Sequence, residues 1–119
     1  MTQPRNPPVV GPTLASPPML ISEFQASIVD FYCQNPDSLT YSMLGLAGET
    51  GEVIEKYKKA LRIHQPEDLR NTDIAMDIAD ELGDVLWYMA RICQEIGVSL
   101  NDVAQMNITK LAARRAEAV

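Results

Sequence analysis

The chain of 119 residues is poor in the residues that build sheets and in the long apolar runs that cross membranes. It holds only six glycines and seven aromatic side chains, which disfavours a sandwich or barrel with glycine at its many turns. No apolar run approaches the roughly 18 residues that a membrane-spanning helix needs. The N-terminus also lacks the compact apolar segment of a signal peptide. We therefore expect a soluble protein with no membrane among its partners.

Cysteine is scarce as well, because Cys33 and Cys93 are the only two and lie far apart in the sequence. They have no clustered spacing, so they indicate neither a metal-binding motif nor a disulfide framework. Free thiols persist in reducing compartments. We expect two reduced thiols in the core of a cytoplasmic protein.

Basic residues are outnumbered by acids, 10 against 16, which gives a net charge of −6. The first 18 residues contain one base, Arg5, and no acid, so the remaining residues carry 16 acids and 9 bases. An acidic surface of this kind is a poor match for a nucleic-acid polymer or an anionic membrane. A small anion such as a nucleotide remains compatible with it, because a bound cation inverts the local field.

Proline is confined almost entirely to the N-terminus. Six of the eight prolines fall in the first 18 residues, at Pro4, Pro7, Pro8, Pro12, Pro17 and Pro18. Proline pairs and small side chains without a period are typical of disordered or extended segments. We predict a disordered, proline-rich tail over residues 1–18 and one folded domain over residues 19–119.

Four segments of the folded domain have the apolar periodicity of helices. The first begins at a capping box, residues 22–25, and is broken by Asn35 and Pro36. The second and third cover about 39–62 and 73–96, joined by a polar connection, and Gly97 closes the third. An N-cap at Ser99 opens a fourth helix that runs to about Ala116. Short links between four helices predict an all-α protein, a four-helix bundle.

Each of the first three helices has an apolar stripe that we expect to face the core. The stripes comprise Leu20, Phe24, Ile28 and Phe31; Met43, Leu46, Val53, Tyr57 and Leu61; and Ile74, Ile78, Leu82, Val85, Met89 and Ile92.

Acidic residues are concentrated on the third helix, within a stripe about 100° wide at 100° per residue. The stripe contains Asp73, Asp77, Asp80, Glu81 and Asp84. Each like-charge neighbour on a helix costs roughly 0.2–0.5 kcal/mol, and the helix dipole offsets this only near the N-terminus. No Lys or Arg occurs between the first and last of these acids. A divalent cation would supply the missing positive charge.

The second helix offers a matching pair, Glu49 and Glu52, beside its apolar stripe. We expect this pair to face Glu81 and Asp84 across the contact between the two helices. Four carboxylates form an all-oxygen site, which suits Mg²⁺ or Mn²⁺. The sequence has no Glu-x-x-His, and its single histidine, His64, lies in the connection, which disfavours a ferritin-like di-iron site.

A second interpretation of these acids is a solvated helix face without a metal. Glu52 with Lys56 and Glu55 with Lys59 have the spacing of i,i+4 ion pairs. Under this interpretation the chain is a non-enzymatic helical adaptor.

Glycine recurs every third residue at Gly45, Gly48 and Gly51. The phosphate-loop pattern is absent. Glycine costs about 1 kcal/mol relative to alanine inside a helix, so three together indicate close approach by another backbone or a ligand. A locally bent helix is the alternative.

The fourth helix places Asn107 on one face with Leu100, Val103, Ala104 and Leu111. An amide on an apolar face is costly unless it is hydrogen-bonded. Lys110 and Arg114 follow it at spacings of three and seven, so the three side chains are placed to hold a polyphosphate. The alternative is an asparagine bonded to a neighbouring helix beside two solvated bases.

Three motifs in a fixed order resemble the MazG-type nucleoside triphosphate pyrophosphohydrolases of the all-α NTP pyrophosphatase superfamily. They are GLAGETGEV at 45–53, ELGDVLWY at 81–88 and NITKL at 107–111. The resemblance covers about residues 22–115. It departs after the last motif, where the family often has Arg-Tyr-Pro and this chain has Arg114, Arg115 and Ala116.

The resemblance implies hydrolysis of a nucleoside or deoxynucleoside triphosphate to the monophosphate and pyrophosphate, for sanitation or remodelling of the nucleotide pool. It implies Glu49, Glu52, Glu81 and Asp84 as catalytic metal ligands for Mg²⁺, with Mn²⁺ able to substitute. The expected substrate-binding residues are Asn107, Lys110, Arg114 and Lys59. It also implies a homodimer or a dimer of dimers, since four short helices leave apolar surface uncovered. A related all-α metal hydrolase acting on another phosphorylated nucleotide is the alternative.

Overall fold

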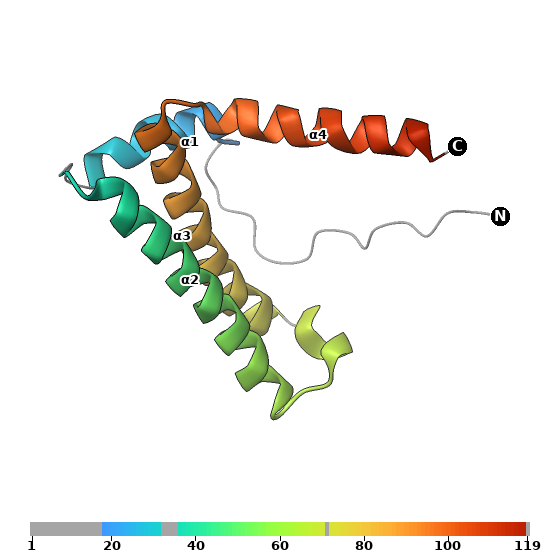
Figure 1. Cartoon of the computed structure of the whole chain (residues 1–119). Coiled ribbons are helices and arrows are strands. Elements are labelled where there is room, and N and C mark those ends of the chain that lie inside the picture. The colour runs from blue at the N-terminus through green and yellow to red at the C-terminus, as the bar shows by residue number, and fades with distance from the viewer. Residues whose placement is uncertain (1–17, 32–35, 71, 119) are drawn as a thin grey trace.

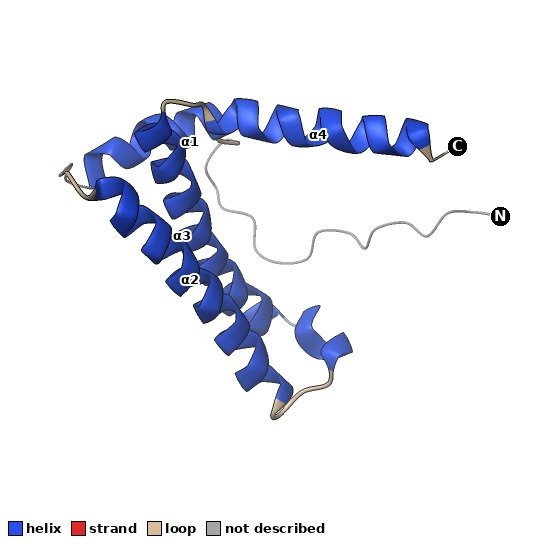
Figure 2. Ribbon diagram, viewed as in Figure 1, coloured by secondary structure: helices blue, strands red, loops and turns tan. Residues whose placement is uncertain are grey.

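The computed structural model describes residues 18–31, 36–70 and 72–118, and this part of the chain is helical without a strand (Figures 1 and 2). The elements are α1 (Ile21–Ile28), the 3₁₀ helix η1 (Val29–Phe31), α2 (Ser38–Leu61), the 3₁₀ helix η2 (Pro66–Arg70), α3 (Thr72–Ile96) and α4 (Leu100–Glu117). The all-α prediction with four helices is confirmed.

Local signals explain most helix ends. Ser99 caps α4 as predicted, because its side-chain oxygen accepts a hydrogen bond from the Asp102 backbone N–H at 2.9 Å. Gly97 ends α3 with a φ of +76°, a conformation that glycine adopts without strain. The capping box at 22–25 is wrong: α1 begins at Ile21, and the Glu23 carboxylate accepts from the Leu20 N–H at 3.4 Å. The polar connection also contains η2, which the sequence did not predict.

The main body of the fold is a hairpin of α2 and α3, which run antiparallel beside each other (Figure 1). α1 crosses one end of this hairpin near the start of α4. The buried apolar core lies at this end and consists of Ile28, Ala90, Cys93 and Leu100. The side chains of Ile21, Phe24, Leu86 and Trp87 pack against it, partly buried.

Gln25 connects the three helices at this end. Its side-chain N–H donates to the Val98 carbonyl at 3.1 Å and to the Gln94 amide oxygen at 3.3 Å. Its own amide oxygen accepts from the Leu100 backbone N–H at 2.8 Å. A buried amide with these partners is well satisfied, so Gln25 fixes α1 to the turn from which α4 begins.

α4 extends away from the hairpin and does not lie along it (Figure 1). All its described residues beyond Leu100 are exposed, including Asn107, which we expected on a covered face. Within one chain, the fourth side of the predicted bundle is therefore open.

Several predicted core residues are also exposed. They are Leu20, Phe31, Met43, Tyr57, Leu61, Leu82 and Met89. A hairpin has only one contact surface between its two helices, so a wide apolar stripe needs a further layer before all of it is covered. Four apolar residues are buried in the described part, whereas 21 large apolar side chains are exposed there.

Cys93 is a free, buried thiol, as predicted, and burial raises the pKa of its thiol. Cys33 and residues 1–17 of the predicted tail lie outside the described residues. Among the described helices, none combines the length and apolar character needed to cross a membrane.

Candidate metal centre

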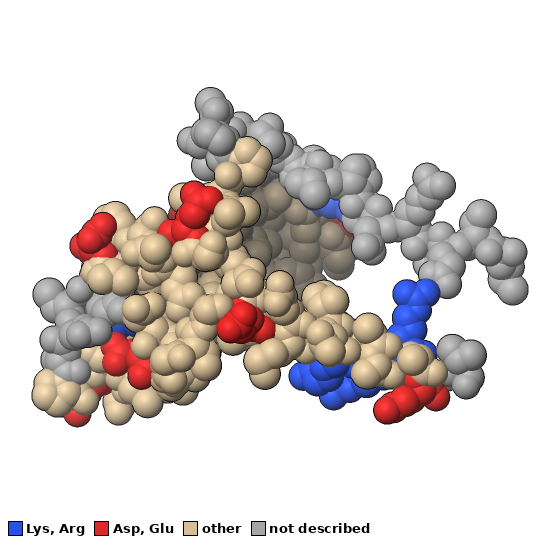
Figure 3. All heavy atoms as spheres, turned by 90° about the horizontal axis from the view of Figure 1, so that it is seen from above, with Lys and Arg blue, Asp and Glu red and all other residues tan. Residues whose placement is uncertain are grey.

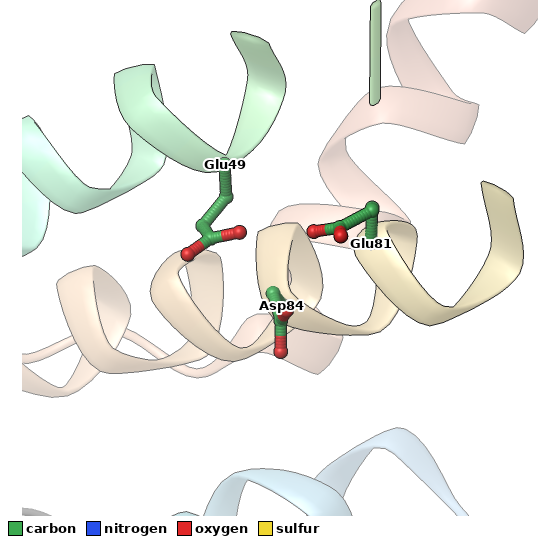
Figure 4. Close-up of side chains that lie close together, drawn as sticks. All are labelled: Glu49, Glu81 and Asp84. Carbon is green, nitrogen blue, oxygen red and sulfur yellow. The ribbon is translucent and has the colours of Figure 1, made fainter. Parts of the chain in front are cut away.

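Three carboxylates from two helices converge between α2 and α3 (Figure 4). Glu49 comes from α2, and Glu81 and Asp84 come from α3. One oxygen of each carboxylate lies within 4.8 Å of the others. Glu49 and Glu81 are half-buried and Asp84 is exposed, so the group is open to solvent on one side. We call these three residues the carboxylate centre.

The contact between the helices beside this centre is set by Gly45 and Tyr88. The Tyr88 ring occupies the space where a β-carbon on Gly45 would lie, so any larger residue there would overlap the ring. Gly45 is one turn before Glu49, and Tyr88 is one turn after Asp84. Tyr88 also meets the Trp87 ring edge to face, with centroids 4.9 Å apart. The ring in this contact therefore fixes the spacing of the helices next to the carboxylate centre.

The other glycines of the predicted group behave differently. A β-carbon on Gly48 or Gly51 would meet no atom within 4 Å, and the same holds for Gly83 beside Asp84. The expected close approach therefore occurs at Gly45 alone, and a side chain makes it instead of a backbone. Gly48 and Gly83 leave open space on either helix next to the carboxylate centre.

The carboxylates of the centre disfavour one another's charge. The pKa of Glu49 is raised, first by its partial burial and then by the charges of Asp84 and Glu81. A side-chain hydrogen bond between Glu49 and Glu81 and the charge of Glu52 raise this pKa further. A cation placed among the three groups would offset this mutual repulsion.

Lys56 brings a positive charge to the carboxylate centre. Its ammonium nitrogen is 3.9 Å from an oxygen of Glu81. The sequence paired Lys56 with Glu52, and this expectation is wrong. Lys56 follows Glu49 by seven residues and so shares its helix face, which turns toward α3. One ammonium among three carboxylates leaves an excess of negative charge.

The expected ion pair of Glu55 and Lys59 is present, at 3.9 Å, and Glu55 also pairs with Lys58 at 3.5 Å. These three residues form the solvated side of α2.

Glu52 lies outside the group of three oxygens, exposed on α2. Its charge still reaches Glu49, whose pKa it raises. The structure therefore brings together three of the four predicted ligands and leaves the fourth at the edge.

The predicted phosphate-binding residues of α4 are not brought to the carboxylate centre in this chain. Asn107, Lys110 and Arg114 are all exposed on the projecting helix. In the view of Figure 3, Lys and Arg gather toward the C-terminal part of α4, apart from most of the acids. Lys59 is nearer, because it lines a pocket between α2 and α3 together with Lys56.

The donor set of the carboxylate centre fits a hard divalent cation. All three groups offer oxygen, and Mg²⁺ and Mn²⁺ prefer carboxylate oxygen and water. No His or Cys belongs to the group, which disfavours the softer transition metals. The open side leaves room for water or substrate oxygens to complete a coordination shell.

The chain is also similar in sequence to known proteins. The model of the MazG nucleotide pyrophosphohydrolase domain matches residues 37–119, which span α2, α3 and α4. The chain is also similar to the "Gene 37 protein" of Mycobacterium phage L5, with 37% identity over 83 residues. That match covers 70% of this chain and 71% of the relative. No solved structure matches the chain significantly.

Proposed function

The chain belongs to the MazG nucleotide pyrophosphohydrolase family, and from this premise we propose that it hydrolyses nucleoside or deoxynucleoside triphosphates to the monophosphate and pyrophosphate. The convergence of Glu49, Glu81 and Asp84 within 4.8 Å carries the proposal. Three acids this close favour a bound cation, and nucleotide phosphates commonly bind Mg²⁺ held by one or two carboxylates. The physiological role is sanitation or remodelling of the nucleotide pool.

The proposed ligands of Mg²⁺ are the carboxylate centre and Glu52, whose charge already acts on Glu49. Mn²⁺ substitutes because it accepts the same oxygen donors. When bound at these residues, the metal would neutralise phosphate charge and would lower the pKa of the attacking water.

The reaction adds water to the α-phosphorus and breaks its bond to the oxygen that bridges to the β-phosphorus. Pyrophosphate leaves with that oxygen. The residues of this chain bind and orient the groups, and no covalent nucleophile is needed. Lys59 contacts the nucleotide from the pocket beside the carboxylate centre, and Asn107, Lys110 and Arg114 contact its phosphates.

Asn107 and Lys110 reach the phosphates only if α4 covers a carboxylate centre, so we propose that a second copy supplies α4. The chain assembles as a homodimer or a dimer of dimers. The abundance of exposed apolar side chains, among them Met106, Ile108 and Leu111 of α4, supports this assembly.

Mixing two impaired variants tests the shared site. In Lys110→Ala the carboxylates are intact, and in Glu49→Gln α4 is intact. Random pairing of the two variants in a dimer restores one complete site in each mixed pair, about a quarter of wild-type turnover. Turnover no higher than the average of the separate variants would show that each chain uses its own α4.

The activity itself is tested with a panel of nucleoside and deoxynucleoside triphosphates in Mg²⁺ or Mn²⁺. We expect pyrophosphate and the monophosphate as products. Release of orthophosphate, or turnover only with other phosphorylated nucleotides, would indicate the related hydrolase activity. No turnover and no Mg²⁺ binding by calorimetry would indicate the adaptor.

A further inference from the structure

A pocket of about 350 Å³ opens between α2 and α3 on the side of the carboxylate centre toward η2. Its apolar lining includes Ile63, Ile74 and Ile78, and its charged lining includes Asp77 and Lys56. Small-molecule pockets in proteins have this character, mostly apolar with a few polar groups that fix orientation.

The pocket adjoins the carboxylate centre through Lys56. Lys56 lines the pocket, and its ammonium lies 3.9 Å from a Glu81 oxygen. Asp77 precedes Glu81 by one helical turn, about 6 Å, and Lys56 follows Glu49 by two turns, about 10 Å. A nucleotide with its phosphates at the carboxylate centre would extend its sugar and base over one to two turns into this pocket.

The chemistry of the pocket fits a nucleobase better than a phosphate. Isoleucine side chains offer no hydrogen bond to phosphate oxygens, and the carboxylate of Asp77 repels them. The ammonium groups of Lys56 and Lys59 are already near Glu81 and Glu55. A planar base, in contrast, gains apolar contact with the isoleucines and donates N–H groups to a carboxylate, which only accepts.

We propose that this pocket takes the nucleobase of the substrate and that Asp77 selects bases with an exocyclic amino group. This inference rests on the proposed function. Cytosine, adenine and guanine offer an NH₂ donor to Asp77. Uracil and thymine offer one N–H between two carbonyl oxygens, and those oxygens are repelled by the carboxylate.

The first measurement is kcat/KM for the five deoxynucleoside triphosphates in Mg²⁺, for the wild type and Asp77→Asn. We expect the wild type to prefer dCTP, dATP and dGTP. Asp77→Asn lowers kcat/KM for these three by about tenfold, the scale of one charge-assisted hydrogen bond, and leaves dUTP and dTTP unchanged or improved. Asp80→Asn, on the same helix but outside the pocket lining, keeps the wild-type ranking.

Binding separates this inference from the proposed activity. The second measurement is the Kd of the five deoxynucleoside monophosphates by calorimetry in Mg²⁺, which requires no turnover. Base-selective binding that Asp77→Asn removes would support the pocket even if no triphosphate were hydrolysed, an outcome that would overturn only the activity. Turnover with the same base ranking in wild type and Asp77→Asn would overturn the pocket.

A third variant tests the apolar lining. Ile63 is 81% exposed, so Ile63→Ser leaves the core intact. We expect it to weaken monophosphate binding severalfold for every base without changing inhibition by pyrophosphate. Inhibition by pyrophosphate that becomes stronger in Asp77→Asn but not in Asp80→Asn would show that the pocket holds phosphate, which would overturn the inference.

Discussion

The α2–α3 hairpin and α4 each carry residues that are predicted to act on a nucleotide. The single chain brings together those of the hairpin but not those of α4. The hairpin brings Glu49, Glu81 and Asp84 within 4.8 Å. α4 leaves Asn107 and Lys110 in solvent. The difference arises from packing, because α2 and α3 contact each other along their length while α4 is held only at its first residues (Figure 1).

A motif on two packed helices is thus placed by the chain itself, here through the Gly45–Tyr88 contact. A motif on a single projecting helix is placed by whatever that helix docks against. Substitutions in the hairpin should therefore act in the isolated subunit, and those in α4 should act through the assembly.

The largest effect is expected in the hairpin. Asp84→Asn or Glu49→Gln removes a proposed metal ligand and should reduce turnover at least about a hundredfold, the scale of losing one electrostatic stabiliser of a transition state. Chelation with EDTA should do the same to the wild type. Pyrophosphate release and Mg²⁺ titration calorimetry measure both. Full turnover after thorough chelation would contradict the metal centre.

On α4, Lys110→Ala should lower kcat/KM about ten- to a hundredfold, because a charge-assisted phosphate contact is worth about 1.5–3 kcal/mol. The free energy of unfolding should change by no more than about 0.5 kcal/mol, as for an exposed lysine. Arg115→Ala is the matched control on the same helix and should leave kcat/KM unchanged. Wild-type kinetics in Lys110→Ala would place the phosphates away from α4.

Two glycines of α2 have different surroundings, since Gly45 packs against a side chain and Gly48 faces open space. Gly45→Ala should destabilise the fold by about 1–3 kcal/mol, because its methyl group overlaps the Tyr88 ring. Gly48→Ala, three residues on, meets nothing and should stabilise the fold by up to about 1 kcal/mol. Urea denaturation measures both. Equal effects would mean that Tyr88 does not fix the helix spacing.

The smallest effect concerns the charge of the metal-free centre. The pKa of Glu49 is higher in the folded than in the unfolded protein. The free energy of unfolding therefore falls as the pH rises from the unfolded-state pKa to the folded-state pKa. In EDTA, Glu49→Gln should therefore raise the melting temperature slightly at pH 7. This gain should vanish at a pH low enough to protonate Glu49 in both states. A lower melting temperature in Glu49→Gln would instead show that the Glu49 carboxylate stabilises the fold.

The sequence predicted the helices well because helix signals are local. The expected 39–62 and 73–96 correspond to Ser38–Leu61 and Thr72–Ile96, and the cap at Ser99 is correct. The start of α1 was misplaced because Ser22 and Glu23 both fit an N-terminal pattern, and propensity alone does not choose between adjacent registers.

Long-range packing limited what the sequence could predict about the site. The i,i+3 spacing places Glu81 and Asp84 side by side on any helix, but only the contact with α2 decides that Glu49 joins them and Glu52 does not. Lys56 can pair with an acid on α2 or with one on α3. The spacing of residues along one helix does not show which of these ion pairs forms. The same holds for Asp77, whose pocket is formed jointly by α3 and by residues at and after the end of α2.

The hydrogen bonds of Gln25 hold α4 at its first residue, so Leu100 is the pivot about which the helix can tilt. Its 18 residues form a rod about 27 Å long, and Lys110 lies about 15 Å from the pivot at Leu100. A turn of about 10° there would carry the lysine about 3 Å, as far as one whole hydrogen bond is long. In the isolated subunit, the position of the Lys110 ammonium group thus depends on how firmly Gln25 and the buried Leu100 hold the start of α4.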